Sequence, residues 1–260
     1  KKNNIDSSDI DEVIMGQVLT GGSGQNPARQ ASIKAGLPIE IPAYIVNQVC
    51  GSGLRSIAAG YQSIKAGEAK IIIAGGQENM SLAPHAIHLR NGKKLGDKKL
   101  TDTMIQDGLW DAFNEYHMGV TAENVAEKFQ VTREEQDKFA LRSQEKALKA
   151  QKEKRFYDEI VNFKIKNKKN EINFSQDEHP RDGLNLETLS RLKPVFKKEG
   201  TVTAGNSSGI NDGAAAVTLM SNDEVERKGM EKLVSIKSWA SCGVDPALMG
   251  TGPIPSSKKA

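Results

Sequence analysis

The chain has few cysteines, few aromatic residues and no long apolar run. Two cysteines in 260 residues cannot form the disulfide framework of a small secreted domain. No apolar stretch approaches the ~20 residues that a membrane-spanning helix needs. Aromatic residues make up only 5% of the chain, which does not favour an aromatic-rich binding module. We therefore expect a cytoplasmic protein with an ordinary packed core and no membrane partner.

The chain also has little excess of one sign of charge, because its 36 Lys and Arg are nearly balanced by 33 Asp and Glu. A net charge of +3 is too small to indicate binding to nucleic acid, so we expect no nucleic-acid partner. His85 and His88 are three residues apart and superficially suggest metal ligands. No third ligand is convincingly spaced from them, so the sequence predicts no metal site.

What the first third of the chain does contain is an alternation of strand and helix patterns. Asn26 and Pro27 are typical of a helix start, and apolar runs such as 71–74 are typical of a strand buried on both faces. The predicted elements, in order, are a strand at Val13–Val18, a helix at Pro27–Ala35, a strand at Pro42–Val49, a helix at Leu54–Lys65 and a strand at Lys70–Ala74. The pattern predicts an α/β fold around a parallel sheet covered on both faces.

The pattern changes to loops and helices between about 81 and 206. A capping box at Thr132–Glu135 predicts a helix to Lys152, with Phe139 and several alanines on its packing face. The apolar run Ala214–Met220 returns to strand character, and we expect it to complete the first sheet.

Near the end of the chain, Leu233–Ala240 predicts a further strand, which would place Cys242 at a strand end in a structural role. The chain opens on a polar segment without Met and ends in what resembles the first turn of a helix. We therefore expect both termini to be truncated.

The strongest local signal is Cys50, which lies between a predicted strand and a glycine-rich helix start at 51–53. Unpaired amides and the positive end of a helix dipole stabilise a thiolate, which is the nucleophilic form of cysteine. The same amides can donate hydrogen bonds to an oxyanion on a thioester carbonyl. A buried structural cysteine is the alternative interpretation of the same pattern.

At this motif the chain resembles the thiolase family, and in particular its short-chain acyl-CoA acetyltransferases. The resemblance extends in order through GGQENMS at 75–81, DGL at 107–109, YHMG at 116–119, TAEN at 121–124, GTVTAGNSSGINDGAAA at 200–216, GVDP at 243–246 and MGTGP at 249–253. It implies a thiolase-like α/β fold in three parts. Residues 1–80 and 211–229 would form the N-terminal half, 81–210 an inserted loop domain, and 230–260 the start of the C-terminal half.

The resemblance also implies roles for individual residues. Cys50 matches the acyl-carrying nucleophile, and the stretch His88–Met104 resembles the loop through which tetrameric members associate. Coenzyme A is a substrate and product rather than a cofactor. The residues that match its binding positions are Leu109, His117 and Met118 at the pantetheine tunnel and acyl pocket, Arg181, Thr188, Leu189 and Phe196 at the adenosine end, Ala204, Ser207, Ser208 and Ile210 along the pantetheine, and Met249 in the substrate pocket.

The implied reaction is a ping-pong condensation of two acetyl-CoA to acetoacetyl-CoA and CoA, and the reverse thiolysis. The family's catalytic His and second Cys match no position up to Ala260, so we expect the chain alone to be inactive. The alternatives are a 3-ketoacyl-CoA thiolase of fatty-acid degradation, a CoA-binding protein without turnover, and a condensing enzyme that uses an acyl carrier protein. A redox role for Cys50, through a reversible disulfide with that absent second Cys, is a further alternative.

Overall fold

The computed structural model describes residues 5–90, 92, 94–166 and 170–260. It divides into two compact units. Unit 1 consists of Lys1–Glu115, Ile210–Gly243 and Gly252–Ala260. Unit 2 consists of Tyr116–Gly209 and Val244–Thr251. The division into two thiolase halves and an inserted loop domain stays a prediction.

Unit 1 is built on a four-stranded sheet. Its strands are β1 (Glu12–Gly16), β2 (Ala43–Val46), β3 (Ile71–Asn79) and β10 (Asp212–Met220), in the order β10-β3-β1-β2. β2 and β3 both run parallel to β1, whereas β10 runs antiparallel to β3. In the observed register, Ile14 of β1 lies opposite Ala74 of β3, and Met220 of β10 lies opposite Ile71 of β3. The structure confirms the predicted parallel sheet and the strand at 214–220 that completes it.

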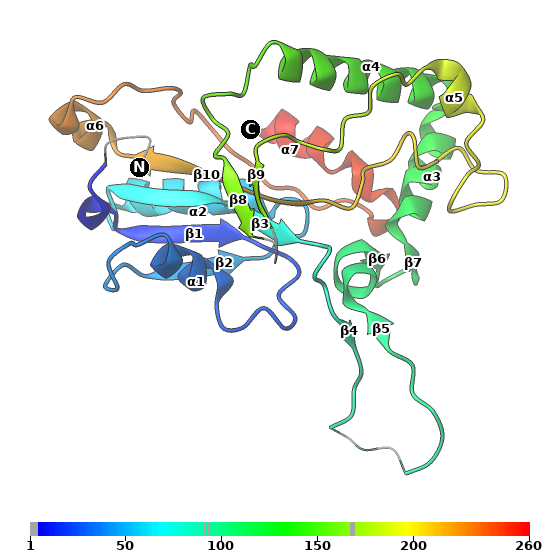
Figure 1. Cartoon of the computed structure of the whole chain (residues 1–260), viewed down its shortest axis with the longest axis horizontal. Coiled ribbons are helices and arrows are strands. Elements are labelled where there is room, and N and C mark those ends of the chain that lie inside the picture. The colour runs from blue at the N-terminus through cyan, green and yellow to red at the C-terminus, as the bar shows by residue number, and fades with distance from the viewer. Residues whose placement is uncertain (1–4, 91, 93, 167–169) are drawn as a thin grey trace. The chain divides into compact units, whose positions relative to one another are not determined.

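One helix covers each face of this sheet (Figure 1). Val13 and Met15 pack with Ala28 of α1 (Pro27–Lys34). Ile14 points to the other face, where its cluster packs with apolar side chains of α2 (Ser52–Ala66). Successive side chains of a strand alternate between faces, so a strand with apolar residues at every position needs a layer on each side.

The ends of both helices follow the local sequence. Asn26 caps α1, since its side chain accepts a hydrogen bond from the Arg29 amide at 3.1 Å, and Pro27 occupies the first helical position. Helix α2 ends at Ala66, and the residue after it, Gly67, has a φ of 79° that glycine adopts without steric cost. These starts and stops confirm the two predicted helices.

The rest of unit 1 is made of short elements. They are η1 (Ser7–Asp9), β4 (His85–Ala86), β5 (Thr101–Asp102), the π-helical turn η2 (Met104–Leu109), β6 (Trp110–Asp111), α6 (Asn222–Lys228) and α7 (Pro253–Lys259). The stretch His88–Met104, expected to mediate oligomerisation, includes residues 91 and 93, which lie outside the described part of the chain.

The predicted strand at Leu233–Ala240 is wrong. Residues 233–242 have neither helix nor strand structure, and Leu233 is 91% exposed. An apolar run becomes a strand only where a neighbouring strand pairs with its backbone, and none does so here within the described residues. Cys242 is therefore half-buried in an irregular segment and does not end a strand.

Unit 2 is mainly helical. Its elements are β7 (Tyr116–His117), α3 (Met118–Phe129), α4 (Arg133–Lys152), the hairpin of β8 (Phe163–Lys166) and β9 (Glu171–Phe174), α5 (Leu186–Ser190) and η3 (Pro246–Thr251). The predicted capping box of α4 is present, with Thr132 and Glu135 bonded to each other's backbone amides. The predicted packing face is wrong at Phe139, which is 66% exposed. Asp137 is buried instead, because Arg133 and Asn206 satisfy its carboxylate.

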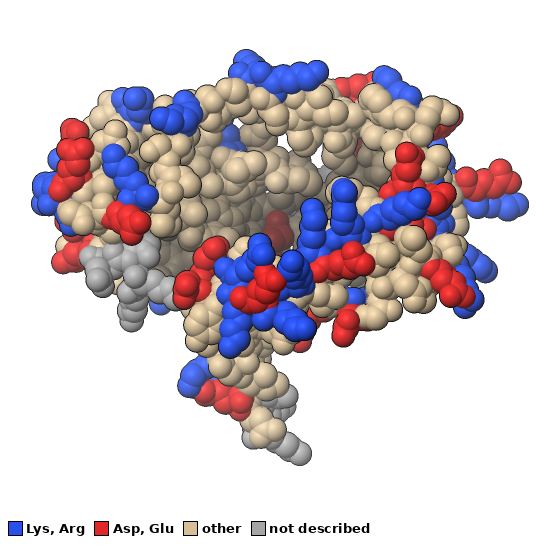
Figure 2. Space-filling model, turned by 90° about the horizontal axis from the view of Figure 1, so that it is seen from above, with Lys and Arg blue, Asp and Glu red and all other residues tan. Residues whose placement is uncertain are grey.

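Both signs of charge are interspersed on the surface, as Figure 2 shows for one face, where Lys and Arg lie beside Asp and Glu. Among the described residues, no helix combines the length and the apolar character needed to cross a membrane.

Candidate functional site

Cys50 lies in a tight turn that joins β2 to α2, and its side chain is exposed. The turn is at the carboxyl end of parallel strands, which is where open α/β sheets generally bind ligands. Helix α2 begins two residues later at Ser52, and no side chain caps its N-terminus. The Ser52 amide donates to the Val49 carbonyl at 3.1 Å, so the amides next in order, those of Gly53 and Leu54, are the ones that can face an anion next to the thiol.

The backbone of this turn is strained at Val49, which has a φ of 48°. A β-branched residue rarely adopts a positive φ, and such strain costs about 1–3 kcal/mol. Hydrogen bonds hold the conformation. The Gly51 amide donates to the Gln48 carbonyl at 3.0 Å, and the Ser52 hydroxyl donates to the Val49 carbonyl at 2.6 Å. These bonds fix the backbone on both sides of Cys50, which is exposed.

Close backbone packing places the start of α2 against the sheet. A Cβ added to Gly16, the last residue of β1, would lie 2.4 Å from the carbonyl carbon of Ser52. Ser56 is fully buried, and its hydroxyl oxygen lies 2.7 Å from the carbonyl oxygens of both Gly53 and Gly75, which share its single proton. The end of β1 and the middle of β3 therefore determine where the cysteine turn lies.

The segment 239–241 lies beside the same turn. The sequence did not predict that these two parts of the chain are neighbours. The Gln48 side-chain amide donates to the Ser241 hydroxyl at 2.8 Å. The Arg55 guanidinium lies over the Trp239 ring, 5.2 Å from its centre, in the geometry of a cation–π contact. These contacts join residues about 190 positions apart in the chain, and no local pattern reports such a separation.

In unit 2, His117 and Phe196 form a stacked pair with ring centres 4.7 Å apart. The His117 Nδ1 atom accepts a hydrogen bond from the Gly119 amide at 3.0 Å and so caps α3. Partial burial lowers the pKa of His117 below its ordinary value. Because Nδ1 is an acceptor, the neutral ring carries its proton on Nε2 and can donate from that side.

This arrangement makes the stability of unit 2 depend on pH. Neutral His117 is favoured in the folded state, so its contribution is complete above the unfolded pKa of about 6.5. The contribution is lost as pH falls through the lower folded pKa, since a protonated Nδ1 cannot accept from Gly119. NMR titration of the ring should give a midpoint below 6.5, and the variant His117→Asn should lose this part of the pH dependence. A midpoint above 6.5 would contradict the assignment.

The other residues predicted at the adenosine end of CoA differ in exposure. The side chain of Arg181 is exposed, and its backbone amide donates to Gln144 at 3.0 Å. Thr188 is also exposed, but its hydroxyl belongs to the capping box of α5. Leu189 is fully buried, so its side chain packs inside unit 2. Their roles in binding CoA stay predictions.

The residues predicted along the pantetheine are exposed. Ala204, Ser207 and Ser208 lie on a loop of unit 2, while Ile210 belongs to unit 1.

The two remaining predicted pocket residues also fall in different units. Leu109 ends η2 in unit 1, and Met249 lies in η3 of unit 2. Asn124 of α3 holds η3, because its side-chain amide donates to the Ala247 carbonyl at 3.1 Å. Met118, the first residue of α3, is half-buried next to the His117 cap.

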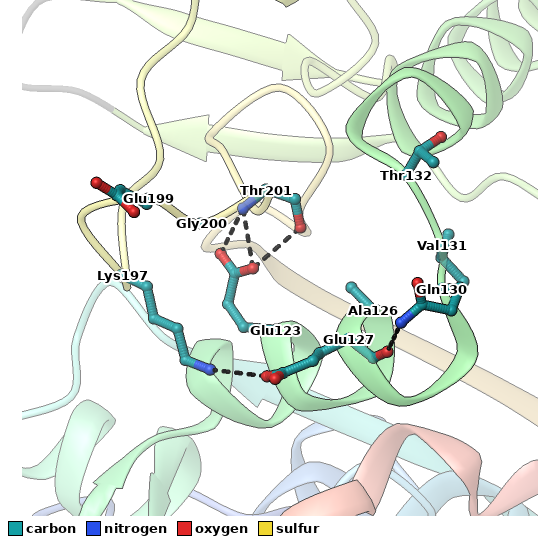
Figure 3. Close-up of a pocket in the computed structure, with 10 residues that line it drawn as sticks. All are labelled: Glu123, Ala126, Glu127, Gln130, Val131, Thr132, Lys197, Glu199, Gly200 and Thr201. Carbon is teal, nitrogen blue, oxygen red and sulfur yellow. Dashed lines mark hydrogen bonds and ion pairs between the residues drawn. The ribbon is translucent and has the colours of Figure 1, made fainter.

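Unit 2 also has a pocket of about 340 Å³ between α3, the α3–α4 connection and residues 197–201 (Figure 3). Its wall includes Glu123, whose carboxylate accepts hydrogen bonds from the amide and the hydroxyl of Thr201. Lys197 and Glu127 also line the pocket, and the Lys197 Nζ atom lies 3.9 Å from Glu127 Oε2. None of the predicted CoA-binding residues lines this pocket. No group of three or more possible metal ligands occurs in the described parts of the chain.

Known proteins resemble this chain along almost its whole length. A family model described as "Thiolase, N-terminal domain" matches residues 1–223. The chain is 60% identical to an acetyl-CoA acetyltransferase of Rhizobium meliloti (strain 1021), over 98% of this chain and 65% of that protein. It is 59% identical to the enzyme of the same name from Paracoccus denitrificans, over 98% of this chain and 66% of that protein.

A solved structure has the same fold. The crystal structure of the Bacillus anthracis acetyl-CoA acetyltransferase superimposes with a TM-score of 0.95 at 41% identity, and the match covers 98% of this chain and 65% of that one. The α/β fold with its mainly parallel sheet is therefore the fold of that protein's corresponding part. The chain spans about 65% of the length of the relatives that it matches.

Proposed function

This chain belongs to the thiolase family, and from that premise we propose that the protein carrying it is an acyl-CoA acyltransferase. In this proposal it condenses two acetyl-CoA molecules to acetoacetyl-CoA and CoA, and catalyses the reverse thiolysis. The names of its relatives, acetyl-CoA acetyltransferase, support the short acyl chain. CoA takes part as substrate and product.

The exposed thiol of Cys50 at the uncapped N-terminus of α2 carries this proposal. A nucleophilic cysteine needs access to its substrate and an environment that favours the thiolate. The turn provides access because the thiol is exposed, and the first amides of α2 provide a partial positive charge next to it.

The proposed reaction has two stages. The Cys50 thiolate attacks the carbonyl carbon of acetyl-CoA, the carbon–sulfur bond to CoA breaks, and CoA leaves as its thiolate. The α-carbon of a second acetyl-CoA then loses a proton and attacks the acetyl group on Cys50. The new carbon–carbon bond forms as the Cys50 thiolate leaves. The resemblance assigns the proton transfers to a His and a Cys outside these 260 residues.

The proposal includes how the substrates bind and how the chains assemble. Unit 2 would bind CoA through the exposed loop that carries Ala204, Ser207 and Ser208, together with His117 and Phe196. The stretch His88–Met104 would associate copies of the chain into a tetramer. We also place the protein in the cytoplasm.

Acetyl transfer to the enzyme tests the proposal directly. The full-length protein should take up radiolabelled acetyl groups from acetyl-CoA in the absence of a second substrate, and thiolysis should release the label. Cys50→Ala should abolish labelling and should lower the activity at least ~10³-fold, because the covalent step is lost. Cys242→Ala is the matched control and should retain both. Label retained by the Cys50 variant would refute the role of this thiol.

A further inference from the structure

The loop of residues 201–207, here called the anchored loop, has a buried side and an exposed side. Val202 and Thr203 are buried at 5% and 0% exposure. Ala204 and Ser207, which follow them in the chain, are exposed. The buried side holds the loop and the exposed side is open to a ligand, while the Ser207 hydroxyl also donates to the Thr203 carbonyl within the loop.

Asn206 ties the two ends of the anchored loop together. Its side-chain oxygen accepts from the Thr203 amide at 2.8 Å, and its side-chain nitrogen donates to the Thr201 carbonyl at 3.0 Å. The same nitrogen donates to Asp137 Oδ1 at 3.0 Å. Both donors of the amide group are thus used, one within the loop and one to helix α4.

Asp137 connects this loop to the helices. It is only 3% exposed, and its second oxygen accepts from Arg133 Nε at 2.8 Å. Arg133 in turn donates to the carbonyls of Leu189 and Leu192, at 2.6 and 3.1 Å. A buried carboxylate is tolerated because each oxygen has a charged or polar donor. Asp137 therefore makes one connection from α4 to the loop and, through Arg133, one to the end of α5.

We propose that Asp137 is a positioning residue for CoA, acting through Asn206 on the exposed side of the anchored loop. The inference rests on the proposed function, which assigns Ala204 and Ser207 to the pantetheine. Glu123 holds the start of the loop independently through the Thr201 and Val202 amides. Loss of Asp137 should therefore displace the Asn206 end of the loop while the rest of unit 2 stays folded.

Asp137→Asn is the informative variant. An amide at this position can accept from one of its two partners, but its NH₂ group then faces the other donor. The oxygen should face Arg133, because a charged donor makes the stronger hydrogen bond, so the contact to Asn206 is lost without a change in size. In the full-length protein we expect the KM for acetyl-CoA and the Kd for CoA to rise about tenfold, equivalent to about 1.4 kcal/mol. The kcat and the rate at which iodoacetamide alkylates Cys50 should stay within about twofold.

A mutant cycle distinguishes positioning from general destabilisation. On the background of Asn206→Ala, the further change Asp137→Asn should raise the KM by less than about twofold, because the residue acts through the missing amide. Glu134→Ala is the matched control on the same helix, since Glu134 is exposed and pairs with Lys138 in solvent. It should leave KM and kcat unchanged.

Two results would overturn the inference in different ways. An active Asp137→Asn protein with an unchanged KM would overturn the inference alone, even if its unfolding midpoint fell. An unsubstituted protein that does not bind CoA in calorimetry would overturn the proposed function and the inference with it.

Discussion

Replacing Gly16 by Ala should lower the free energy of unfolding of unit 1 by about 3 kcal/mol, the upper part of the usual range for overpacking. The added Cβ would lie 2.4 Å from the Ser52 carbonyl carbon and 2.5 Å from the Gly53 nitrogen. Both are backbone atoms of the first turn of α2, which cannot rotate away as a flexible side chain would. The start of the helix must move from the sheet, and the cysteine turn must move with it.

Urea unfolding of the chain measures the stability effect, and the alkylation rate of Cys50 in a Cys242→Ser background measures the displacement of the turn. We expect the alkylation rate to change at least threefold. Gly53→Ala is the matched control, because a Cβ there meets no atom within 4 Å and Ala favours a helix. If the two alanine variants are equally stable, the packing of β1 against α2 is not as tight as the structure indicates.

Replacing Glu123 by Ala should have a comparable effect in unit 2. The Glu123 carboxylate is 4% exposed and accepts from the amides of Thr201 and Val202, at 2.9 and 2.8 Å, and from the Thr201 hydroxyl. Removing it leaves the buried Val202 amide and the half-buried Thr201 amide without their partner, and an unpaired buried donor costs about 1–3 kcal/mol. We expect a loss of about 3 kcal/mol in the free energy of unfolding.

Thermal and urea unfolding should show this loss, and hydrogen exchange should show faster opening at residues 201–203. Glu127→Ala is the control, because Glu127 lies one turn further along α3 with a side chain that is 80% exposed. It should change stability by less than about 0.5 kcal/mol. Equal losses in the two variants would show that burial of the Glu123 carboxylate does not anchor residues 201–202.

Local sequence was sufficient for several elements of both units. The predicted helix at Pro27–Ala35 differs from α1 by one residue, and the capping box at Thr132–Glu135 starts α4 as expected. Such features depend on contacts between residues a few positions apart. The strand predicted at Leu233–Ala240 failed because a strand needs a partner from elsewhere in the chain.

The candidate site divides in the same way. The sequence by itself determined that a cysteine follows a strand and precedes a glycine-rich helix, because both patterns are local. Only the tertiary structure decided that Gly16 packs on that helix, that Trp239 lies beside Arg55, and that Asp137 is buried under Asn206. The residues of these pairs are between about 36 and 184 positions apart in the chain. Their contacts arise when whole elements pack together, and the periodicity of a single segment does not report such packing.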